Sequence, residues 1–289
     1  MTGPVIIGGV GGSGTRVVVN VLQAFSFNFG KDLNKANDNL TFTLLFRRPG
    51  WLEENISNEN LISLGIRILE KSMITRSCYS INELSYLIKA TIWMMKNGLF
   101  KNQNKKAKWA FNRFQKAIIN TQKLPPDIIG WGWKEPNSHL LLENLNGYFP
   151  EMKYIHTIRN GLDMAFSANQ NQLYNWGKLY GVKMPEKEAD IPAASFSYWV
   201  KANKKVLELQ KQVGKDKIYL LNFDRLCSNP SEEIKKLIEY LGINVSNEKF
   251  QQAVGIPVIP DSSGRYKKYD ISNFNQNDID FYNSLGFLT

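Results

Sequence analysis

The 289-residue sequence contains only two cysteines and two histidines. Cys78 and Cys227 lie far apart and form no CxxC or Cys/His grouping, which argues against a metal site and against a disulfide framework. No apolar run approaches the roughly 20 residues that a membrane-spanning helix needs, and the first residues lack the features of a signal peptide. The sequence therefore predicts a globular protein without a metal centre, in a reduced cytoplasmic setting.

Acidic residues are missing from one long stretch. None occurs between Glu83 and Asp127, whereas nine Lys and Arg residues do, so this stretch carries +9 of a total net charge of +10. Such a charge suits a protein that binds polyanions. Three interpretations stay open: a solvated face, a wall that attracts an anionic acceptor with Trp93, Phe100 and Trp109 as flat surfaces, or a surface for nucleic acid or anionic lipid.

The same stretch has helical periodicity. Apolar residues recur at spacings of three and four, which is typical of one face of an amphipathic helix. The first such stripe consists of Ile81, Leu84, Ile88, Ile92, Met95 and Leu99. The second consists of Ala107, Ala110, Phe111, Phe114 and Ile118. We expect these helices to belong to an α-helical insertion that covers about residues 51–127.

Residues 4–20, PVIIGGVGGSGTRVVVN, form an apolar run that breaks into glycines and then resumes with helical spacing. We expect a buried strand, a turn and a helix. The turn glycines are Gly11, Gly12 and Gly14. Glycine suits this place because it adopts positive φ without steric cost and lets a ligand approach the backbone. Unpaired N–H groups and the positive end of a helix dipole meet there, which predicts a phosphate site.

The spacing from Gly9 to Gly14 is that of a P-loop, but the two residues that follow it differ. A P-loop continues Gly-Lys-Ser/Thr, in which the lysine reaches the β and γ phosphates and the hydroxyl holds magnesium. Here Thr15 takes the lysine's place and Arg16 the hydroxyl's. Because arginine cannot ligate a metal, the loop predicts transfer from a phosphate-bearing donor without an obligatory metal ion.

The segment GGVGGSGTR resembles the donor-phosphate loop of sulfotransferases. The common form of that loop, Pro-Lys/Arg-Ser-Gly-Thr-Thr, holds the 5′-phosphosulfate of 3′-phosphoadenosine 5′-phosphosulfate (PAPS). Ser13, Gly14 and Thr15 match directly, whereas Gly12 falls where many members have a basic residue and Arg16 is the nearby substitute. The donor-binding residues that the resemblance implies in this loop are Gly11, Gly12, Ser13, Gly14, Thr15 and Arg16.

Two later segments extend the resemblance. IRNGLDMAFS, residues 158–167, is similar to the family's 3′-phosphate motif, in which Ile-Arg-Asp-Pro-Arg-Asp precedes a serine. Arg159, Asp163 and Ser167 match it, and an arginine suits an anion because it is always ionised and offers a planar fork of donors. Near the end, SSGRYKK resembles the loop that closes over the 3′-phosphate. The resemblance thus implies Gly264 and Arg265 as further donor-binding residues.

Sulfuryl transfer needs cations and a base. Charge builds on the departing bridging oxygen while the acceptor sheds a proton. Arg16 and Lys134, the latter at the end of a predicted strand, are the candidate cations. The candidate bases are Glu135, which is the neighbour of Lys134, and His139. The histidine is a candidate because its unperturbed pKa is about 6.5.

Strands that alternate with helices predict an α/β fold, a three-layer α/β/α sandwich with a central parallel sheet that is P-loop-like. Ligands bind such sheets at the carboxyl ends of the strands. The β-branched and aromatic residues 41–47 are expected to form the second strand. Glu53 and Glu54, which follow it, are a further place for a base. His156 is expected in the core.

We therefore expect one sulfotransferase-like domain, residues 1–289, that moves a sulfuryl group from PAPS to a hydroxyl or amine of a small-molecule or glycan acceptor. Two alternatives stay open. A degenerate P-loop kinase predicts ATP binding and magnesium dependence. A non-catalytic protein that binds polyanions through residues 89–123 predicts binding that survives mutation of Arg159.

Overall fold

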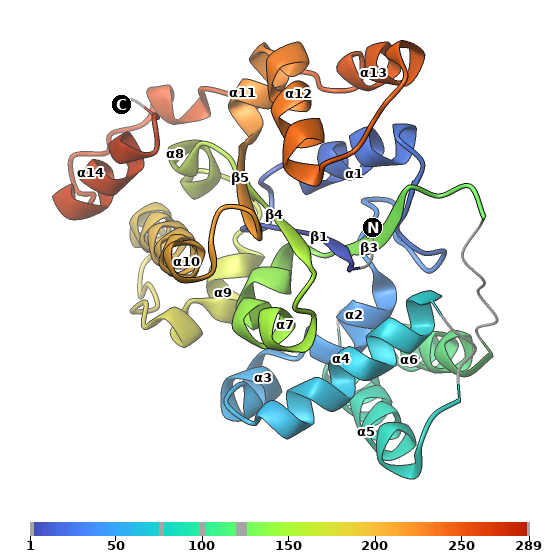
Figure 1. Ribbon diagram of the computed structural model, residues 1–289. Helices are drawn as coiled ribbons and strands as arrows, with labels where there is room; N and C mark the ends of the chain where they lie inside the picture. Colours follow the sequence, from blue (N-terminus) through green and yellow to red (C-terminus); the bar gives the residue numbers. More distant parts are fainter. Residues whose placement is uncertain (1–2, 75–77, 99–101, 120–125, 288–289) are drawn as a thin grey trace. The chain divides into compact units, whose positions relative to one another are not determined.

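The computed structural model describes residues 3–74, 78–98, 102–119 and 126–287 (Figure 1). Leu99 and Phe100, named above, lie outside the described residues. The chain divides into two compact units, and each is described by itself. Unit 1 comprises Met1–Ile6 and Ser26–Met152, and unit 2 comprises Ile7–Phe25 and Lys153–Thr289. That the whole chain acts as a single domain stays a prediction.

The strands form one five-stranded parallel sheet in the order β2-β3-β1-β4-β5. Their bounds are Val5–Gly8 (β1), Phe27–Asn28 (β2), Gly130–Lys134 (β3), Lys153–Ile158 (β4) and Ile218–Asn222 (β5). Phe27 pairs with Gly130 in unit 1, and Tyr154 pairs with Ile218 in unit 2. The predicted α/β fold with a central parallel sheet is confirmed.

The prediction of a strand at residues 41–47 is wrong. These residues lie in helix α2 (Leu40–Phe46), all of which is buried. Asn39 caps the helix, since its side chain accepts a hydrogen bond from the N–H of Phe42 at 2.8 Å. A short, fully buried apolar run fits a helix or a strand equally well, and the N-cap decides between them. The second strand is the two-residue β2.

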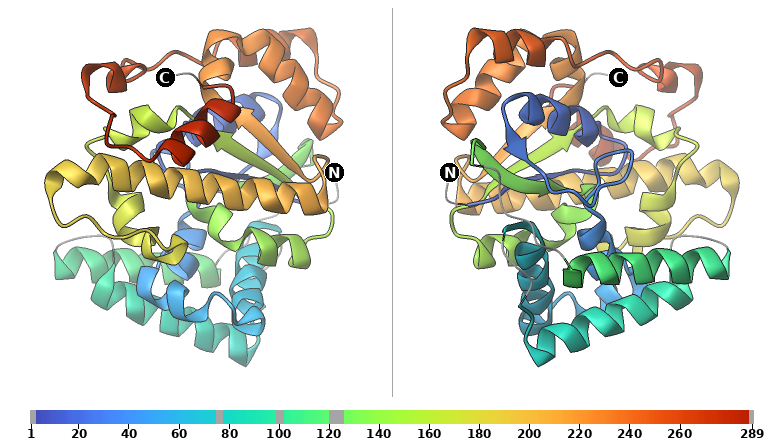
Figure 2. Two further views of the ribbon diagram at one scale, coloured as in Figure 1. Left: turned by 90° about the vertical axis from the view of Figure 1, so that its left-hand side faces the viewer. Right: turned by 90° about the vertical axis from the view of Figure 1, so that its right-hand side faces the viewer.

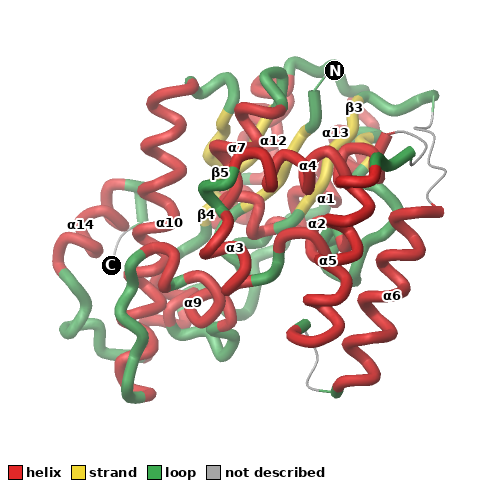
Figure 3. Tube along the Cα trace, turned by 90° about the horizontal axis from the view of Figure 1, so that it is seen from below, coloured by secondary structure: helices red, strands yellow, loops and turns green. Residues whose placement is uncertain are grey.

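The helices of unit 1 confirm that the described part of residues 51–127 is mainly helical. They are α2, α3 (Pro49–Asn55), α4 (Glu59–Ile74), α5 (Ile81–Asn97), α6 (Gln103–Ile119), the 3₁₀ segment η1 (Pro136–Leu141) and α7 (Leu142–Tyr148). A capping box of Ser80 and Glu83 starts α5. α5 and α6 run side by side (Figure 3). Among the described residues of both units, no helix has the length and apolarity that a membrane span requires.

In unit 2, helices cover both faces of β4 and β5, with α10 on one face and α1 and α12 on the other (Figure 2). His156 on β4 is fully buried, and its Nε2 lies 2.8 Å from Oδ1 of Asn203 on α10, so the prediction of a core histidine is confirmed. The elements are α1 (Thr15–Ala24), α8 (Gly161–Ala165), α9 (Asn171–Trp176), η2 (Lys178–Tyr180), η3 (Glu188–Asp190), α10 (Ile191–Val213), α11 (Phe223–Ser228), α12 (Pro230–Leu241), α13 (Asn247–Val254), η4 (Arg265–Lys268) and α14 (Gln276–Ser284).

Candidate functional site

The glycine loop of unit 2 joins β1 to α1 as the sequence predicts. Gly12 and Gly14 have φ values of 95° and 87°. A Cβ on Gly14 would lie 2.2 Å from the ring of Phe223, so no larger residue fits there without a shift. α1 begins at Thr15 with no acidic residue in its first turn, and first-turn N–H groups have no partner within a helix. The positive end of α1 is therefore not neutralised by its own side chains.

The side chains of the loop point in different directions. Ser13 is almost completely buried, its N–H donates to the carbonyl of Val10 at 3.0 Å, and its Oγ has no hydrogen-bond partner among the described residues. That hydroxyl lies close to Gly9, where an added Cβ would be 2.7 Å from it. Thr15 is buried and Arg16 is exposed. The loop thus offers a ligand its backbone and the exposed Arg16.

Arg159, directly after β4, contacts the glycine loop. Its Nη1 donates to the carbonyl of Gly12 at 3.4 Å, and its Nη2 donates to Oγ of Ser262 at 2.6 Å. Its guanidinium carbon lies 5.6 Å from the ring centre of Phe223, and its Nε is buried without a partner in the described part of the chain. Two segments that were predicted separately as anion sites therefore meet within one unit.

One small cavity of unit 2 is lined by five of the ten predicted donor-binding residues. Its volume is about 100 Å³. The predicted residues in its wall are Gly11, Gly12, Arg159, Ser167 and Arg265. This is enough room for a phosphate group. The walls carry two guanidinium groups, so the cavity suits one anion.

Asp163 positions the C-terminal basic turn against this cavity. Its carboxylate is buried and accepts hydrogen bonds from the N–H groups of Gly264, at 2.7 Å, and Tyr266, at 3.1 Å. Gly264 has a φ of 77° and starts the turn. Asp163 and Gly264 therefore shape the turn, and Arg265 is the residue of the turn that lines the cavity.

Sequence reasoning missed two glutamines that support the cavity. Nε2 of Gln170 donates to the carbonyl of Ser167 at 2.6 Å, and its Oε1 accepts from Oγ of Ser195 at 2.6 Å. A Cβ on Gly11 would lie 2.5 Å from Nε2 of Gln172, so this side chain covers the loop closely. The only sequence signal here is the polar and aromatic composition of residues 170–192, which predicts a lid-like loop or short helices. The structure has the short helices α9, η2 and η3 in this segment.

The candidate cation Lys134 lies in unit 1 and is buried. Its Nζ forms an ion pair with Asp38 and donates to the carbonyl of Ala36 at 2.9 Å. The other carboxylate oxygen of Asp38 accepts from Nδ2 of Asn34 at 2.8 Å. Asp38 is a third residue that sequence reasoning missed. It lies in the loop after the true second strand, and the loop escaped notice because that strand was assigned to residues 41–47.

Glu135, next to Lys134, is buried and has an unusual pKa. Its burial in the protein and the negative charge of Asp38 raise the pKa of the Glu135 carboxyl to about 7. The charge of Arg47 and hydrogen bonds from Asn137 act in the opposite direction. Oε2 accepts from the N–H of Asn137 at 2.6 Å, and Oε1 accepts from its Nδ2 at 2.9 Å. A pKa near neutrality suits a general base.

The other candidate bases differ in their surroundings. His139 is buried in η1, where its Nδ1 lies 2.8 Å from the carbonyl of Pro136, so Nδ1–H is assigned as the donor. Glu53 and Glu54 lie in α3 and do not follow a strand, because residues 41–47 are helical. The reason for proposing these two glutamates as bases is therefore removed.

The raised pKa of Glu135 predicts a pH-dependent stability. Between about pH 4.5 and 7 the folded state binds more protons than the unfolded state, so the free energy of unfolding falls as the pH rises through that window. Glu135→Gln removes this slope and should stabilise the protein at pH 8 by about 2 kcal/mol. Urea unfolding of both proteins at pH 5, 6, 7 and 8 measures the effect. Parallel curves for the two proteins would contradict it.

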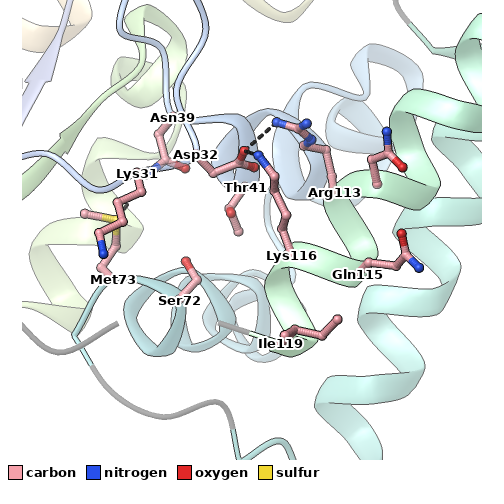
Figure 4. A pocket seen from close by; sticks show the side chains of 11 residues that line it. Lys31, Asp32, Asn39, Thr41, Ser72, Met73, Arg113, Gln115, Lys116 and Ile119 are labelled. Carbon is pink, nitrogen blue, oxygen red and sulfur yellow. Dashed lines mark hydrogen bonds and ion pairs between the residues drawn. The ribbon is translucent and has the colours of Figure 1, made fainter. Parts of the chain in front are cut away.

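Unit 1 contains a larger cavity, of about 550 Å³ (Figure 4). Nζ of Lys116 and Nη1 of Arg113, both on α6, bind Oδ1 of Asp32, the former at 2.8 Å. Lys31 also lines the cavity, so three cations and one carboxylate border it. The remaining wall is mostly hydroxyl and amide, and consists of Asn39, Thr41, Ser72, Met73, Asn112, Gln115 and Ile119. This lining suits a small polar molecule with a negative charge.

Comparisons with known proteins identify a family for the chain and support its fold. A family model described as "Sulfotransferase family" matches residues 4–247. No curated protein matches the chain. The sulfotransferase domain from the curacin biosynthetic pathway is 13% identical, with a TM-score of 0.52, and the alignment covers 100% of this chain and 99% of that domain. This match supports the fold.

Two further solved structures are similar. The sulfotransferase domain of the olefin synthase from Synechococcus PCC 7002 is 13% identical, with a TM-score of 0.47 and coverage of 100% of this chain and 97% of that one. Sulfotransferase STF9 from Mycobacterium avium is 11% identical, with a TM-score of 0.44 and coverage of 87% of this chain and 67% of that one.

Within the described residues, no group of three or more His, Cys, Asp or Glu side chains could hold a metal ion.

Proposed function

Because the chain belongs to the sulfotransferase family, we propose that it transfers a sulfuryl group from PAPS to a hydroxyl or amine of an acceptor. The observation that carries this proposal is a cavity of unit 2 in which the glycine loop meets Arg159, Ser167 and Arg265. An enzyme that binds PAPS must hold two anionic ends of one donor, and both predicted anchors lie in the same unit.

The residues present in unit 2 fit this donor. The loop glycines leave the backbone open to a phosphate, and the first turn of α1 carries no acid. The buried Nε of Arg159 and the buried Oγ of Ser13 both lack partners within the described residues, as expected for groups near an anion site. We propose that Gly11 to Arg16 hold the 5′-phosphosulfate and that Arg159, Ser167 and Arg265 hold the 3′-phosphate.

When bound, PAPS supplies an electrophilic sulfur whose bond to the bridging phosphate oxygen breaks as a bond to the acceptor oxygen or nitrogen forms. The loop N–H groups and Arg16 would stabilise the charge left on the phosphate. Lys134 stays the second proposed cation. Its ammonium also fixes Asp38, and the charge of Asp38 raises the pKa of Glu135.

We propose Glu135 as the base that takes the acceptor's proton, with His139 as the alternative. Glu135 is favoured because a carboxyl with a pKa of about 7 is half ionised near neutral pH and binds a proton readily. Under this proposal, the rate of Glu135→Gln loses the rise with pH that the wild type shows around pH 7. A variant rate that keeps this rise would assign the base to His139 or to another group.

The cavity of unit 1 supports a proposal for the acceptor class. Its hydroxyl and amide groups and its excess of cations favour a small acceptor, or a glycan unit, that bears hydroxyls and a negative charge. Lys31→Gln should weaken the thermal stabilisation by such an acceptor. The stabilisation by adenosine 3′,5′-bisphosphate should stay unchanged, since Lys31 belongs to the other unit.

Ligand-induced thermal stabilisation tests the function. Adenosine 3′,5′-bisphosphate without metal should raise the melting temperature, and ATP with magnesium should raise it much less. Stabilisation by ATP and magnesium alone would instead favour the degenerate kinase. If neither nucleotide stabilises the protein, the sulfuryl-transfer proposal fails and a non-catalytic polyanion-binding protein remains.

A further inference from the structure

Helix α5 exposes three isoleucines of the apolar stripe that its sequence contains. Ile81, Ile88 and Ile92 are 86%, 45% and 46% exposed. At 3.6 residues per turn these three side chains lie within an arc of about 40°. The buried residues of α5 lie on the opposite side of the helix, and they are Glu83, Tyr86, Leu87, Ala90, Thr91 and Met94. α5 therefore has two apolar sides, and only one of them packs into unit 1.

The neighbouring helix α6 also has exposed apolar side chains. Phe111 and Ile118 lie seven residues apart, on one side of α6, and are 47% and 38% exposed. Helices α5 and α6 run beside each other (Figure 3). Six of the ten large apolar side chains that are exposed in the described part of the chain lie on this helix pair. We call Ile81, Ile88, Ile92, Phe111 and Ile118 the apolar patch.

Both helices of the pair also carry exposed lysines. Lys89, Lys96, Lys105 and Lys108 are exposed, and no ion pair links them to a carboxylate within the described residues. Arg113 and Lys116 of α6 differ, because both bind Asp32. With no acidic residue from 84 to 126, the surface combines exposed isoleucine and phenylalanine with uncompensated positive charge.

We propose that this helix pair docks in the plane of an anionic lipid bilayer, with the apolar patch among the headgroups and the lysines on the lipid phosphates. Amphipathic helices with lysine flanks bind membrane surfaces in this way. A surface that serves only for solubility does not need three aligned isoleucines. Nucleic acid would use the lysines but not the patch. A symmetric second copy would bring the lysines of both copies together, which is unfavourable. This inference is independent of the proposed function.

The exposed Cys78 makes the docking measurable. It lies three residues before Ile81, and the only other cysteine, Cys227, is buried. An environment-sensitive fluorophore on Cys78 should shift to shorter wavelength with phosphatidylglycerol vesicles and not with phosphatidylcholine vesicles. Vesicle co-sedimentation of the unlabelled full chain should give the same preference, and 0.5 M salt should weaken it, because salt screens the lysines.

Matched variants distinguish binding through the apolar patch from non-specific binding to vesicles. Ile88→Ser with Ile92→Ser, and separately Lys89→Gln with Lys96→Gln, should each reduce the partition coefficient for anionic vesicles at least tenfold. The controls are Val258→Ser with Ile259→Ser, whose side chains are 71% and 58% exposed, and Lys211→Gln with Lys215→Gln. These should bind vesicles like the wild type. The melting temperature of each variant checks that it is folded.

Several results would overturn the proposal. One is equal binding to neutral and anionic vesicles, and another is no binding to either. If the lysine variant loses binding and the isoleucine variant does not, the helix pair binds polyanions through its lysines and the apolar patch does not enter the bilayer. A dimer in light scattering that Ile88→Ser with Ile92→Ser converts to a monomer, without vesicle binding, would assign the patch to a second copy of the chain.

Discussion

Arg159→Ala should remove most of the affinity for adenosine 3′,5′-bisphosphate and leave the affinity for 5′-AMP nearly unchanged. Arg159 donates to the loop carbonyl of Gly12 and lines the cavity, and we propose that it holds the 3′-phosphate. A hydrogen bond to a charged group contributes about 1.5–3 kcal/mol, so the dissociation constant should rise roughly 10- to 150-fold. Calorimetric titration with both nucleotides measures the difference.

The control for this prediction is Arg225→Ala, which removes an exposed arginine of α11. It should bind the bisphosphate like the wild type. Equal losses of affinity for the bisphosphate and for 5′-AMP in Arg159→Ala would mean that Arg159 supports the loop and does not bind the 3′-phosphate. Unchanged affinity for both nucleotides would remove Arg159 from the donor site.

Gly14→Ala should destabilise the protein strongly and abolish its stabilisation by the bisphosphate. Gly14 has a φ of 87°, and an added Cβ would lie 2.2 Å from the ring of Phe223. A left-handed backbone costs a non-glycine residue about 1–2 kcal/mol, and overpacking costs about 1–3 kcal/mol more. The sum should lower the melting temperature by at least about 5 °C.

Two other glycines separate these contributions. Gly181 has a φ of 62° and open space around it, so Gly181→Ala should show the backbone cost alone. Gly147, in α7, has open space and no positive φ, so Gly147→Ala should be neutral or stabilising by up to about 1 kcal/mol. If Gly14→Ala melts at the same temperature as Gly181→Ala, the contact with Phe223 does not restrict the loop.

The parts of the site that sequence predicts well are local. Residues 4–20 predict a strand, a glycine turn and a helix. This prediction succeeds because positive φ and the start of a helix depend on residues that are neighbours in the sequence. Arg159 at the end of β4 is predictable for the same reason. Gly161 stands where the family motif has proline. This difference has a packing cause, since a Cβ at Gly161 would lie 2.6 Å from the ring of Trp199.

What sequence does not predict depends on contacts between distant segments. The pKa of Glu135 is raised by burial and further by the charge of Asp38, which lies 97 positions away in the chain. Gln170 and Gln172 gain their roles only when α8 and α9 fold beside the loop. For α5, the apolar periodicity predicts the helix correctly but does not predict which side of the helix is buried.

A crystal structure with adenosine 3′,5′-bisphosphate tests the central claim most directly. It should place the 5′-phosphate on the backbone of residues 11–16 and the 3′-phosphate beside Arg159 and Ser167. A nucleotide bound in the cavity between Lys31 and Arg113, or with both phosphates away from Arg159, would contradict the account.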